Sequence, residues 1–352
     1  MLAISFPQPE EFTLIDVPEP EAGPGELVIH VKSTTICATD FKILHGRFPG
    51  VSYPHIPGHE WGGEVIEVGS GVSGFNPGDK VGVEVHVGCG VCPRCYEGLY
   101  NLCEKYGNPE KGHAHIGFTI PGGLAEFCAI PAHAAHVLPE NLDFDHGAFT
   151  DTVGIVLWAI ERGGGVRAGE NVAVVGPGAL GLLAVQIGRA QGARQIIAVG
   201  VMEDKERLEL ALKTGADHII EVDGEMDTAQ AVRDLTSGRG ADFVIEFAGS
   251  AAAAQQSIQM SRRGGRIVLG GATGPGRRLD IDLSTIVRGH LNVYGSVANP
   301  RGISSRANEL MANGCVDINP LITHHFPLSE FPRAWEIFSE RREGVIRPML
   351  HP

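Results

Sequence analysis

Basic charge is scarce in this sequence. Its 28 lysines and arginines are outnumbered by 42 aspartates and glutamates, which gives a net charge of −14 at pH 7 over 352 residues. Nucleic acids are bound through a basic footprint that neutralises their phosphates, and no Lys/Arg cluster interrupts the acidic balance. We therefore expect no nucleic-acid partner.

Long apolar runs and paired cysteines are also lacking. The most apolar window, 172–187, is interrupted by Gly176-Pro177-Gly178 and is too short to span a bilayer. The N-terminal stretch has neither the basic segment nor the apolar core of a signal peptide. The seven cysteines are an odd set with four in one cluster, which fits metal thiolates better than secreted disulfides. We expect a cytoplasmic protein without a membrane partner.

The clustered cysteines follow the pattern Cys89-x2-Cys92-x2-Cys95-x7-Cys103. Cysteines this close rarely satisfy disulfide geometry. They can surround one tetrahedral Zn²⁺, which takes thiolates at about 2.3 Å and needs short ligand spacings. The alternative, four incidental loop cysteines, explains the spacing poorly. The pattern predicts a structural zinc site.

The chain changes character near residue 145, and its length favours two domains. Before that point, short apolar runs such as 26–31 and 63–68 alternate with period two between Gly and Pro, and a further run at 123–130 continues the pattern. This pattern predicts a partly open β-barrel. After a predicted helix at 145–162, apolar strands alternate with helices, which predicts a doubly wound parallel sheet covered on both faces. We expect the α/β class.

A glycine motif, Gly176-x-Gly178-x-x-Gly181, lies between a predicted strand at 171–175 and a predicted helix at 182–190. In that setting it is typical of dinucleotide binding, because its backbone can approach a pyrophosphate at a helix N-terminus. The alternative is a plain turn between strand and helix. The predicted loop residues are Gly176, Pro177, Gly178, Ala179, Leu180 and Gly181.

The position expected to select the coenzyme differs from the usual pattern of dinucleotide-binding domains. The acid that holds an adenosine ribose is expected about 20 residues beyond the motif, where this chain has Gly200, followed by Glu203 and Asp204. Lys205 and Arg207 are close enough to serve a 2′-phosphate instead. The two acids favour NAD over NADP, although the same residues suit a solvated helix start.

Cys37, His59 and Glu60 are candidates for a second metal. Cys37 follows an apolar run and His59 lies in a glycine-rich turn. Catalytic zinc takes three protein ligands and keeps one open position. Asp151, between the two halves of the chain, is the best placed acid for the third ligand, with a helix-start acid as the alternative reading.

Further motifs accompany these sites: Cys37-x-Thr39-Asp40, Gly58-His59-Glu60-x2-Gly63-x5-Gly69-x2-Val72, Gly78-Asp79-Lys80-Val81 and residues 328–334. Together with the cysteine cluster and the glycine motif, the whole chain resembles the zinc-dependent medium-chain alcohol and polyol dehydrogenases, such as sorbitol and threonine dehydrogenases. The resemblance implies a GroES-like catalytic domain at 1–154 and 295–352 and a Rossmann dinucleotide-binding domain at 155–294. It also implies a homo-oligomer, either a dimer or a tetramer.

The resemblance assigns roles to single residues. Thr39 would pass the substrate's hydroxyl proton toward the coenzyme ribose. Lys42 stands where relay-ending members often have histidine, and His45 is a nearby substitute. Asp151 stands where polyol dehydrogenases often have glutamate. The residues implied around the catalytic zinc are Cys37, His59, Asp151 and Glu60, and those implied around the structural zinc are Cys89, Cys92, Cys95 and Cys103.

The predicted reaction follows from the metal and the coenzyme. Zn²⁺ lowers the pKa of bound water from about 15.7 to about 7 and polarises an alcohol oxygen similarly, so that hydride can pass to a nicotinamide. We predict reversible oxidation of a secondary alcohol, polyol or sugar-like, to a ketone with NAD(P). The alternatives are oxidation of threonine or a simple secondary alcohol, a zinc hydrolase, a non-catalytic coenzyme-binding protein stapled by zinc, and a zinc-free double-bond reductase.

Overall fold

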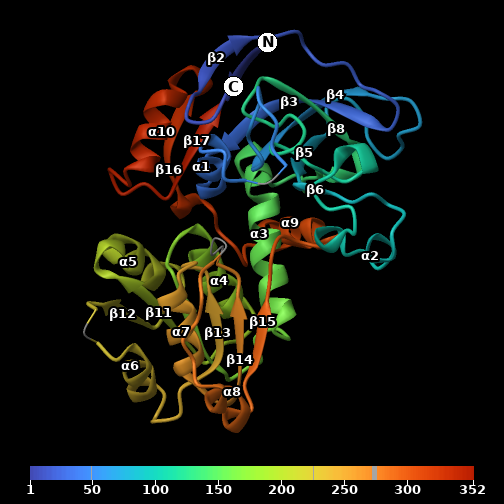
Figure 1. The fold of residues 1–352 in the computed structure, drawn as a ribbon. Helices are drawn as coiled ribbons and strands as arrows, with labels where there is room; N and C mark the ends of the chain where they lie inside the picture. The colour runs from blue at the N-terminus through green and yellow to red at the C-terminus, as the bar shows by residue number, and fades with distance from the viewer. Residues whose placement is uncertain (49, 225, 272–275) are drawn as a thin grey trace. The chain divides into compact units, whose positions relative to one another are not determined.

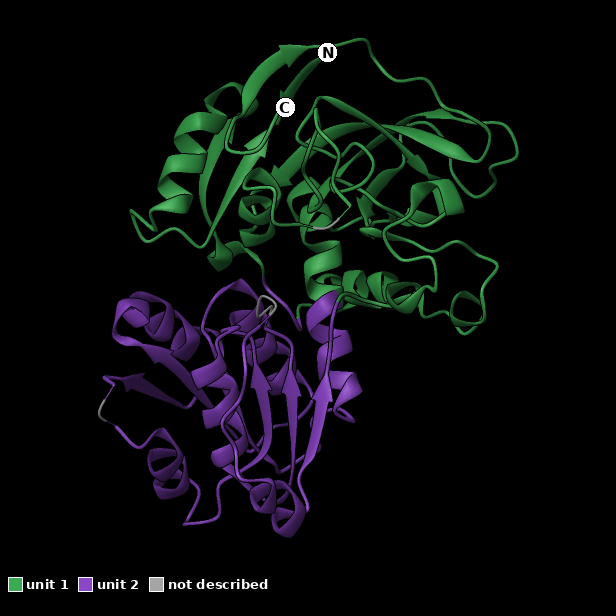
Figure 2. Ribbon diagram, in the orientation of Figure 1, with its two compact units in different colours: residues 1–154, 298–314, 318–352 green, residues 155–297, 315–317 purple. Residues whose placement is uncertain are grey.

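The computed structural model describes residues 1–48, 50–224, 226–271 and 276–352. The chain divides into two compact units, drawn in green and purple in Figure 2. The first unit contains Met1–Gly154, Ala298–Gly314 and Ile318–Pro352, and the second contains Ile155–Val297 and Cys315–Asp317.

A seven-stranded sheet organises the first unit (Figure 1). Its central strand β3 (Glu26–Thr35) pairs antiparallel with β4 (Trp61–Val68), β8 (Phe127–Pro131) and β17 (Arg347–His351). The period-two pattern therefore predicted β structure correctly. The other strands of this unit are β1 (Leu2–Ser5), β2 (Thr13–Asp16), β5 (Lys80–Val83), β6 (His86–Val87), β7 (Ala114–His115), β9 (Ala135–Val137) and β16 (Ile322–Pro327).

One predicted strand is shorter than expected. The run predicted from residue 123 becomes β8 only at Phe127. A Cβ at Gly122 would lie 2.0 Å from the carbonyl oxygen of Gly58, and one at Gly123 would lie 2.3 Å from the Trp61 ring. The segment before β8 therefore packs against the turn that precedes β4, and it pairs with β1 only through an isolated antiparallel bridge between Ala3 and Ala125.

The remaining helical elements of the first unit are short. Aromatic side chains from α10, including Phe331 and Trp335, pack with Phe6 and Phe12 in its core. The helices are α1 (Ala38–Leu44), α2 (Pro93–Tyr96), α9 (Ile303–Ala312) and α10 (Phe331–Ser339), with 3-10 turns at Tyr100–Leu102, Pro109–Lys111, Ala132–Ala134, Asn319–Leu321 and Leu328–Glu330.

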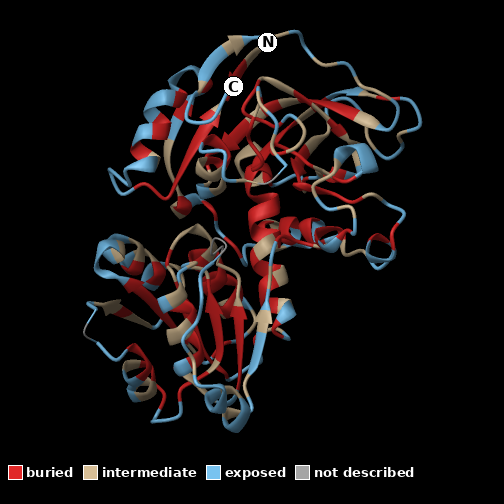
Figure 3. Cartoon of the chain, viewed as in Figure 1, coloured by how far each residue is buried: buried red, intermediate tan, exposed pale blue. Residues whose placement is uncertain are grey.

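The second unit is built on six parallel strands in the order β12-β11-β10-β13-β14-β15. Counted within the unit this is the order 3-2-1-4-5-6 of a dinucleotide-binding sheet. The central strands are apolar and buried, as the red ribbons in Figure 3 show. The strands are β10 (Asn171–Val175), β11 (Gln195–Val201), β12 (His218–Val222), β13 (Ala241–Glu246), β14 (Ser261–Leu269) and β15 (Asn292–Gly295).

Helices connect successive strands of this sheet, so the alternation read from the sequence is confirmed. Helix α4 begins at Ala179, three residues earlier than predicted, because Gly178 already acts as its N-cap. The helices are α4 (Ala179–Ala190), α5 (Lys205–Thr214), α6 (Thr228–Leu235), α7 (Ala251–Gln259) and α8 (Leu283–Gly289), and a 3-10 turn spans Met202–Asp204.

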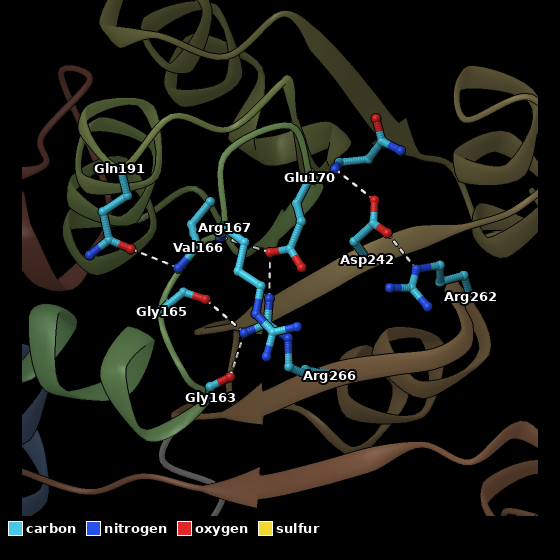
Figure 4. A network of polar contacts seen from close by, with 10 residues as sticks. Gly163, Gly165, Val166, Arg167, Glu170, Gln191, Asp242, Arg262 and Arg266 are labelled. Atoms are coloured by element: carbon cyan, nitrogen blue, oxygen red, sulfur yellow. Dashed lines mark hydrogen bonds and ion pairs between the residues drawn. The ribbon is translucent and has the colours of Figure 1, made fainter.

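A polar network fastens the segment that follows α3 (Phe144–Arg162) to the sheet of the second unit (Figure 4). Arg266 of β14 is buried, forms an ion pair with Glu170, and donates hydrogen bonds of 2.7 Å to the carbonyls of Gly163 and Gly165. Its guanidinium also lies 4.5 Å from the centroid of the Phe243 ring. The buried charge is thus paired and hydrogen-bonded, as burial of an ion requires.

The helix predicted at 145–162 is α3, and its apolar side chains are buried. Phe149, Val153 and Ile160 are at most 1 % exposed. Within the described part of the chain, no helix has both the length and the apolar character needed to cross a membrane.

Candidate metal and coenzyme sites

Three predicted metal ligands converge in the first unit. Cys37 is the N-cap of α1, and His59 and Glu60 immediately precede β4. Their ligand atoms all lie within 4.8 Å of one another. The turn before His59 requires glycine, since Gly58 has a φ of +99° and a Cβ there would lie 2.4 Å from the backbone nitrogen of Leu124. The local chain path therefore presents a thiol, an imidazole and a carboxylate at one point.

Asp40 orients this group. Its side chain is fully buried, one oxygen lies 3.2 Å from His59 Nδ1, and the other accepts a 2.8 Å hydrogen bond from the Cys37 backbone N–H. The contact is an ion-pair distance, since neither His59 Nδ1 nor Asp40 Oδ1 has a hydrogen-bond partner in this structure. A proton on Nδ1 would leave Nε2 as the ligand atom, the usual arrangement in metal-binding histidines. Burial alone would lower the pKa of His59, but Asp40 and Cys37 outweigh it and raise that pKa well above its ordinary value.

Arg347 of β17 holds Glu60. The Nη2 of Arg347 donates a 3.0 Å hydrogen bond to Glu60 Oε1, and its Nη1 donates one of 3.1 Å to the Ile36 carbonyl. Both side chains are buried, and Glu60 Oε2 has no hydrogen-bond partner in this structure. An orphaned carboxylate oxygen beside a thiol and an imidazole fits a cation. The pairing joins residues 287 positions apart, so sequence pattern gave no sign of Arg347.

Asp151 lies on α3 and is 2 % exposed. Its Oδ1 accepts hydrogen bonds from the Val85 backbone N–H at 3.1 Å and from Asn299 Nδ2 at 3.2 Å. Burial raises its pKa to about 7. Among the described residues, the compact ligand group contains Glu60 and not Asp151. The role of Asp151 as a zinc ligand stays a prediction.

The predicted proton-relay residues follow one another along α1. Thr39 Oγ1 lies 3.9 Å from Cys37 Sγ, so its hydroxyl is next to the ligand group. Lys42 is half-buried one turn further on. His45 is the C-cap of the helix and is exposed, with Nδ1 4.0 Å from Glu10.

Aromatic and imidazole rings flank the site. The Phe118 ring lies 4.6 Å from the His59 ring and 5.8 Å from the His115 ring, measured between centroids. His115 is surrounded by further buried rings, including His86 and His113 at 4.5 and 4.6 Å. Burial lowers the pKa of His115 to about 3 and also lowers those of His86 and His113. Burial therefore favours the neutral form of these imidazoles. Their positions in the sequence carried no recognisable motif.

The four-cysteine lobe has the geometry of a closed metal site. The Sγ atoms of Cys89 and Cys95 are 3.9 Å apart, and so are those of Cys92 and Cys103. Two thiolates on a tetrahedral zinc, each at about 2.3 Å, lie about 3.8 Å apart. A backbone hydrogen bond at Glu104 lowers the pKa of Cys92 to about 6, whereas burial raises that of Cys95 to about 12. The donor set and its spacing fit structural zinc.

The glycine motif of the second unit has the features that dinucleotide binding requires. Gly176 has a φ of +92°, and a Cβ at Gly181 would lie 2.0 Å from the Gly176 carbonyl, so helix and strand approach closely. A Cβ at Gly178 would meet no heavy atom within 4 Å, so the second glycine borders open space. Helix α4 begins at Ala179, and its first N–H groups point out of the helix toward that space.

The structure gives a packing reason for Gly200. A Cβ at this position would lie 2.8 Å from the Pro177 ring, so the glycine loop rests on the end of β11. Asp204 pairs with Arg207 at 3.9 Å, and Glu203 is exposed. Asp204 and Arg207, two of the residues predicted to bear on the choice of coenzyme, therefore contact each other after β11.

Known proteins with similar sequences and structures share this architecture. Residues 23–140 match the alcohol dehydrogenase GroES-like domain, and residues 179–313 match the zinc-binding dehydrogenase domain. The chain is 34 % identical to L-threonine 3-dehydrogenase of Pyrococcus furiosus over 99 % of both chains, and 33 % identical to sorbitol dehydrogenase of Halalkalibacterium halodurans over 97 % of this chain and 96 % of that one. A zinc-binding dehydrogenase of Sinorhizobium meliloti 1021, solved bound to NADP, superposes with a TM-score of 0.91 at 32 % identity, covering 100 % of this chain and 99 % of the other.

The chain belongs to the zinc-dependent medium-chain alcohol dehydrogenase family. It combines a GroES-like fold with a Rossmann-type sheet, and it is an NAD(P)-dependent oxidoreductase that acts on CH–OH groups. The predicted family, fold class and reaction class are confirmed. Membership of this family excludes the alternative function of a zinc hydrolase.

Proposed function

We propose that the chain reversibly oxidises a secondary hydroxyl of a small polyol or sugar-like substrate to a ketone. The observation that carries the proposal is the convergence of Cys37, His59 and Glu60 within 4.8 Å. These residues would hold the catalytic zinc, with Asp151 as the further acidic ligand. Cys89, Cys92, Cys95 and Cys103 would hold the structural zinc.

The residues around Cys37, His59 and Glu60 would have different roles in the reaction. When bound, zinc polarises the substrate oxygen and the nicotinamide coenzyme accepts the hydride. The Asp40 carboxylate, 3.2 Å from His59 Nδ1, would favour a proton on that nitrogen and so leave Nε2 as a ligand. Arg347 balances the buried carboxylate of Glu60 at 3.0 Å. Asp40 and Arg347 would thus hold His59 and Glu60 in place before the substrate binds. This reduces the reorganisation that the reaction requires.

Helix α1 would carry the released proton. Thr39 Oγ1 is next to Cys37 Sγ, and positions 39, 42 and 45 succeed one another at helical i,i+3 spacing. Exposure increases from half-buried Thr39 and Lys42 to exposed His45. We propose that Thr39 accepts the substrate proton while it passes its own hydroxyl proton toward the coenzyme ribose, and that Lys42 or His45 then releases a proton to solvent.

In the second unit, the loop from Gly176 to Gly181 would bind the pyrophosphate of the coenzyme. Gly200, Glu203 and Asp204 would border its adenosine ribose. The acidic pair supports NAD, because a carboxylate accepts hydrogen bonds from ribose hydroxyls and repels a 2′-phosphate. Release of Arg207 from its contact with Asp204 would instead favour NADP.

A second candidate substrate is L-threonine. A relative named L-threonine 3-dehydrogenase is 34 % identical over 99 % of this chain. L-Threonine differs from a polyol in carrying an ammonium on the carbon next to the oxidised one and a carboxylate on the far side of that carbon. A threonine enzyme would therefore need charged partners near the site in addition to the metal ligands.

The test is a substrate panel followed by nicotinamide absorbance. Polyols, L-threonine and simple secondary alcohols are offered to zinc-loaded protein with NAD and NADP in parallel. We expect turnover with a polyol and a higher kcat/KM with NAD. Turnover with L-threonine alone would show that threonine, and not a polyol, is the substrate. No turnover with any substrate of the panel would contradict the proposed function.

The assembly and location are proposed from the same family membership. We propose that residues 1–154 and 295–352 form the catalytic domain and 155–294 the coenzyme domain of a cytoplasmic dimer or tetramer. Light scattering coupled to size-exclusion chromatography measures the subunit number directly.

A further inference from the structure

A third group of ligand-type side chains lies in the first unit, outside both zinc sites. Asp145 is in the first turn of α3, His325 is on β16 and His351 is on β17. One ligand atom from each lies within 4.8 Å of the others. None of the three has a part in the proposed reaction.

The two histidines are held together by strand pairing. Strands β16 and β17 run parallel, with His325 opposite Met349 and Pro327 opposite His351. His325 and His351 are therefore diagonal neighbours whose side chains share one face of the sheet. Their rings are nearly parallel, with His325 Nδ1 2.9 Å from His351 Nε2.

Neighbouring groups fix the state of His351. Its Nδ1 is 3.1 Å from the Lys32 carbonyl, so this nitrogen carries the proton and donates the hydrogen bond. Nε2 then presents its lone pair toward His325, as in a histidine prepared to bind metal. The Lys32 ammonium does not compete, since it contacts His30 at 2.8 Å.

Asp145 is also held in place. Ser33 on β3 donates a hydrogen bond to its carboxylate. Asp145 and His351 are half-buried and His325 is exposed, so the group is open on one side. That opening leaves room for water to complete a coordination shell.

The simplest alternative is an imidazole pair joined by one N–H···N hydrogen bond. Two nitrogens on a tetrahedral zinc, each at 2.0–2.1 Å, lie about 3.3 Å apart. The observed 2.9 Å therefore needs to open by about 0.4 Å, which a small rotation of the exposed His325 ring supplies. In that alternative, the Asp145 carboxylate would serve only as the acceptor for Ser33 and as an acid in the first turn of α3, although it lies within 4.8 Å of both imidazoles.

We propose that Asp145, His325 and His351 form an accessory site for a borderline divalent cation, Zn²⁺ or Ni²⁺. Two imidazoles and one carboxylate suit these ions, whereas Mg²⁺ and Ca²⁺ prefer oxygen ligands. The bound ion would join β16 and β17 to the start of α3 and so stabilise the first unit. It exchanges more readily than the other two zincs because one side of the site is open.

Metal counting tests the proposal on the full-length protein loaded with two zincs per chain. Calorimetric titration with Zn²⁺ should show a third equivalent, accompanied by a rise in Tm of about 3 °C at 100-fold excess over its Kd. Titration with Mg²⁺ should show no binding. His325→Gln should abolish the third equivalent and the Tm rise while kcat with the best alcohol is unchanged.

The matched control is His324→Gln, on the same strand, where His324 Nε2 contacts Glu343 at 3.6 Å. This variant should keep the third equivalent. His351→Gln provides a second test, because it removes a ligand without altering β16. A wild-type protein that binds only two zincs, or a third equivalent that persists in His325→Gln, would overturn the proposal. Metal counting does not depend on turnover, so failure of the proposed function is a separate outcome.

Discussion

Single residues outside any motif shape the environment of the catalytic group. His115 is 1 % exposed, and burial holds its pKa at about 3. In the unfolded chain the same imidazole titrates near pH 6.5. Between these values the unfolded chain binds more protons than the folded chain, so stability is full above pH 6.5 and is lost as the pH falls below it.

His115→Phe should remove this acid sensitivity. The wild type should lose about 1.4 kcal/mol from this one residue between pH 7.5 and 5.5, and the variant should not. Differential scanning calorimetry at the two pH values measures the difference. His218→Phe, at a half-buried strand position of the second unit, is the control. Equal acid-induced shifts in His115→Phe and wild type would show that the imidazole is protonated in the folded protein.

Residue spacing predicted which nearby side chains come together, but it did not predict their long-range partners. Cys89 to Cys103 and Gly176 to Gly181 are continuous motifs whose chemistry follows from spacing alone. Arg347 reaches Glu60 across 287 positions, and β17 must pair with β3 before the contact exists. Asp40 belongs to the motif Cys37-x-Thr39-Asp40, but only the structure shows its contact with His59.

At the scale of elements, the buried ion pair of Arg266 and Glu170 joins β14 to the segment before β10 (Figure 4). Arg266→Met would leave the Glu170 carboxylate buried without its counter-charge and would orphan the carbonyls of Gly163 and Gly165. We expect a loss of about 3–5 kcal/mol in the unfolding free energy of the second unit. Urea denaturation followed by circular dichroism measures it.

Two further variants separate the causes of that loss. The double variant Arg266→Met/Glu170→Met should be more stable than Arg266→Met alone, because no unpaired charge remains. Arg263→Met, at an exposed position of the same strand, should change stability little. A double variant as unstable as Arg266→Met would show that the carbonyl contacts, and not the ion pair, hold this segment.

Element types were predictable where one period dominated the sequence. The apolar strands β10, β11 and β13 and the helix α3 have patterns that their buried positions explain. In the run from residue 123 the regular strand begins only at Phe127, because the preceding glycines pack closely against Gly58 and Trp61. Its alternation of apolar residues was the same as that of a paired strand, and only tertiary contacts distinguish the two.

At the scale of the whole molecule, the chain forms two compact units, whose boundaries fall at Gly154 and Ala298. The assignment of residues 1–154 and 295–352 to a catalytic domain and of 155–294 to a coenzyme domain stays a prediction. The substrate was not predictable, because polyol and threonine relatives match this chain about equally, at 33 % and 34 % identity. Substrate contacts depend on side chains that carry no motif.

The most direct test of the central claim is the zinc content and turnover of Cys37→Ser. The account predicts that this variant keeps the four-cysteine zinc and its coenzyme affinity, loses the second zinc and loses turnover. Cys315→Ser, an exposed cysteine outside both sites, should keep both zincs and full activity. Unchanged turnover in Cys37→Ser would contradict the assignment of the catalytic zinc to Cys37, His59 and Glu60.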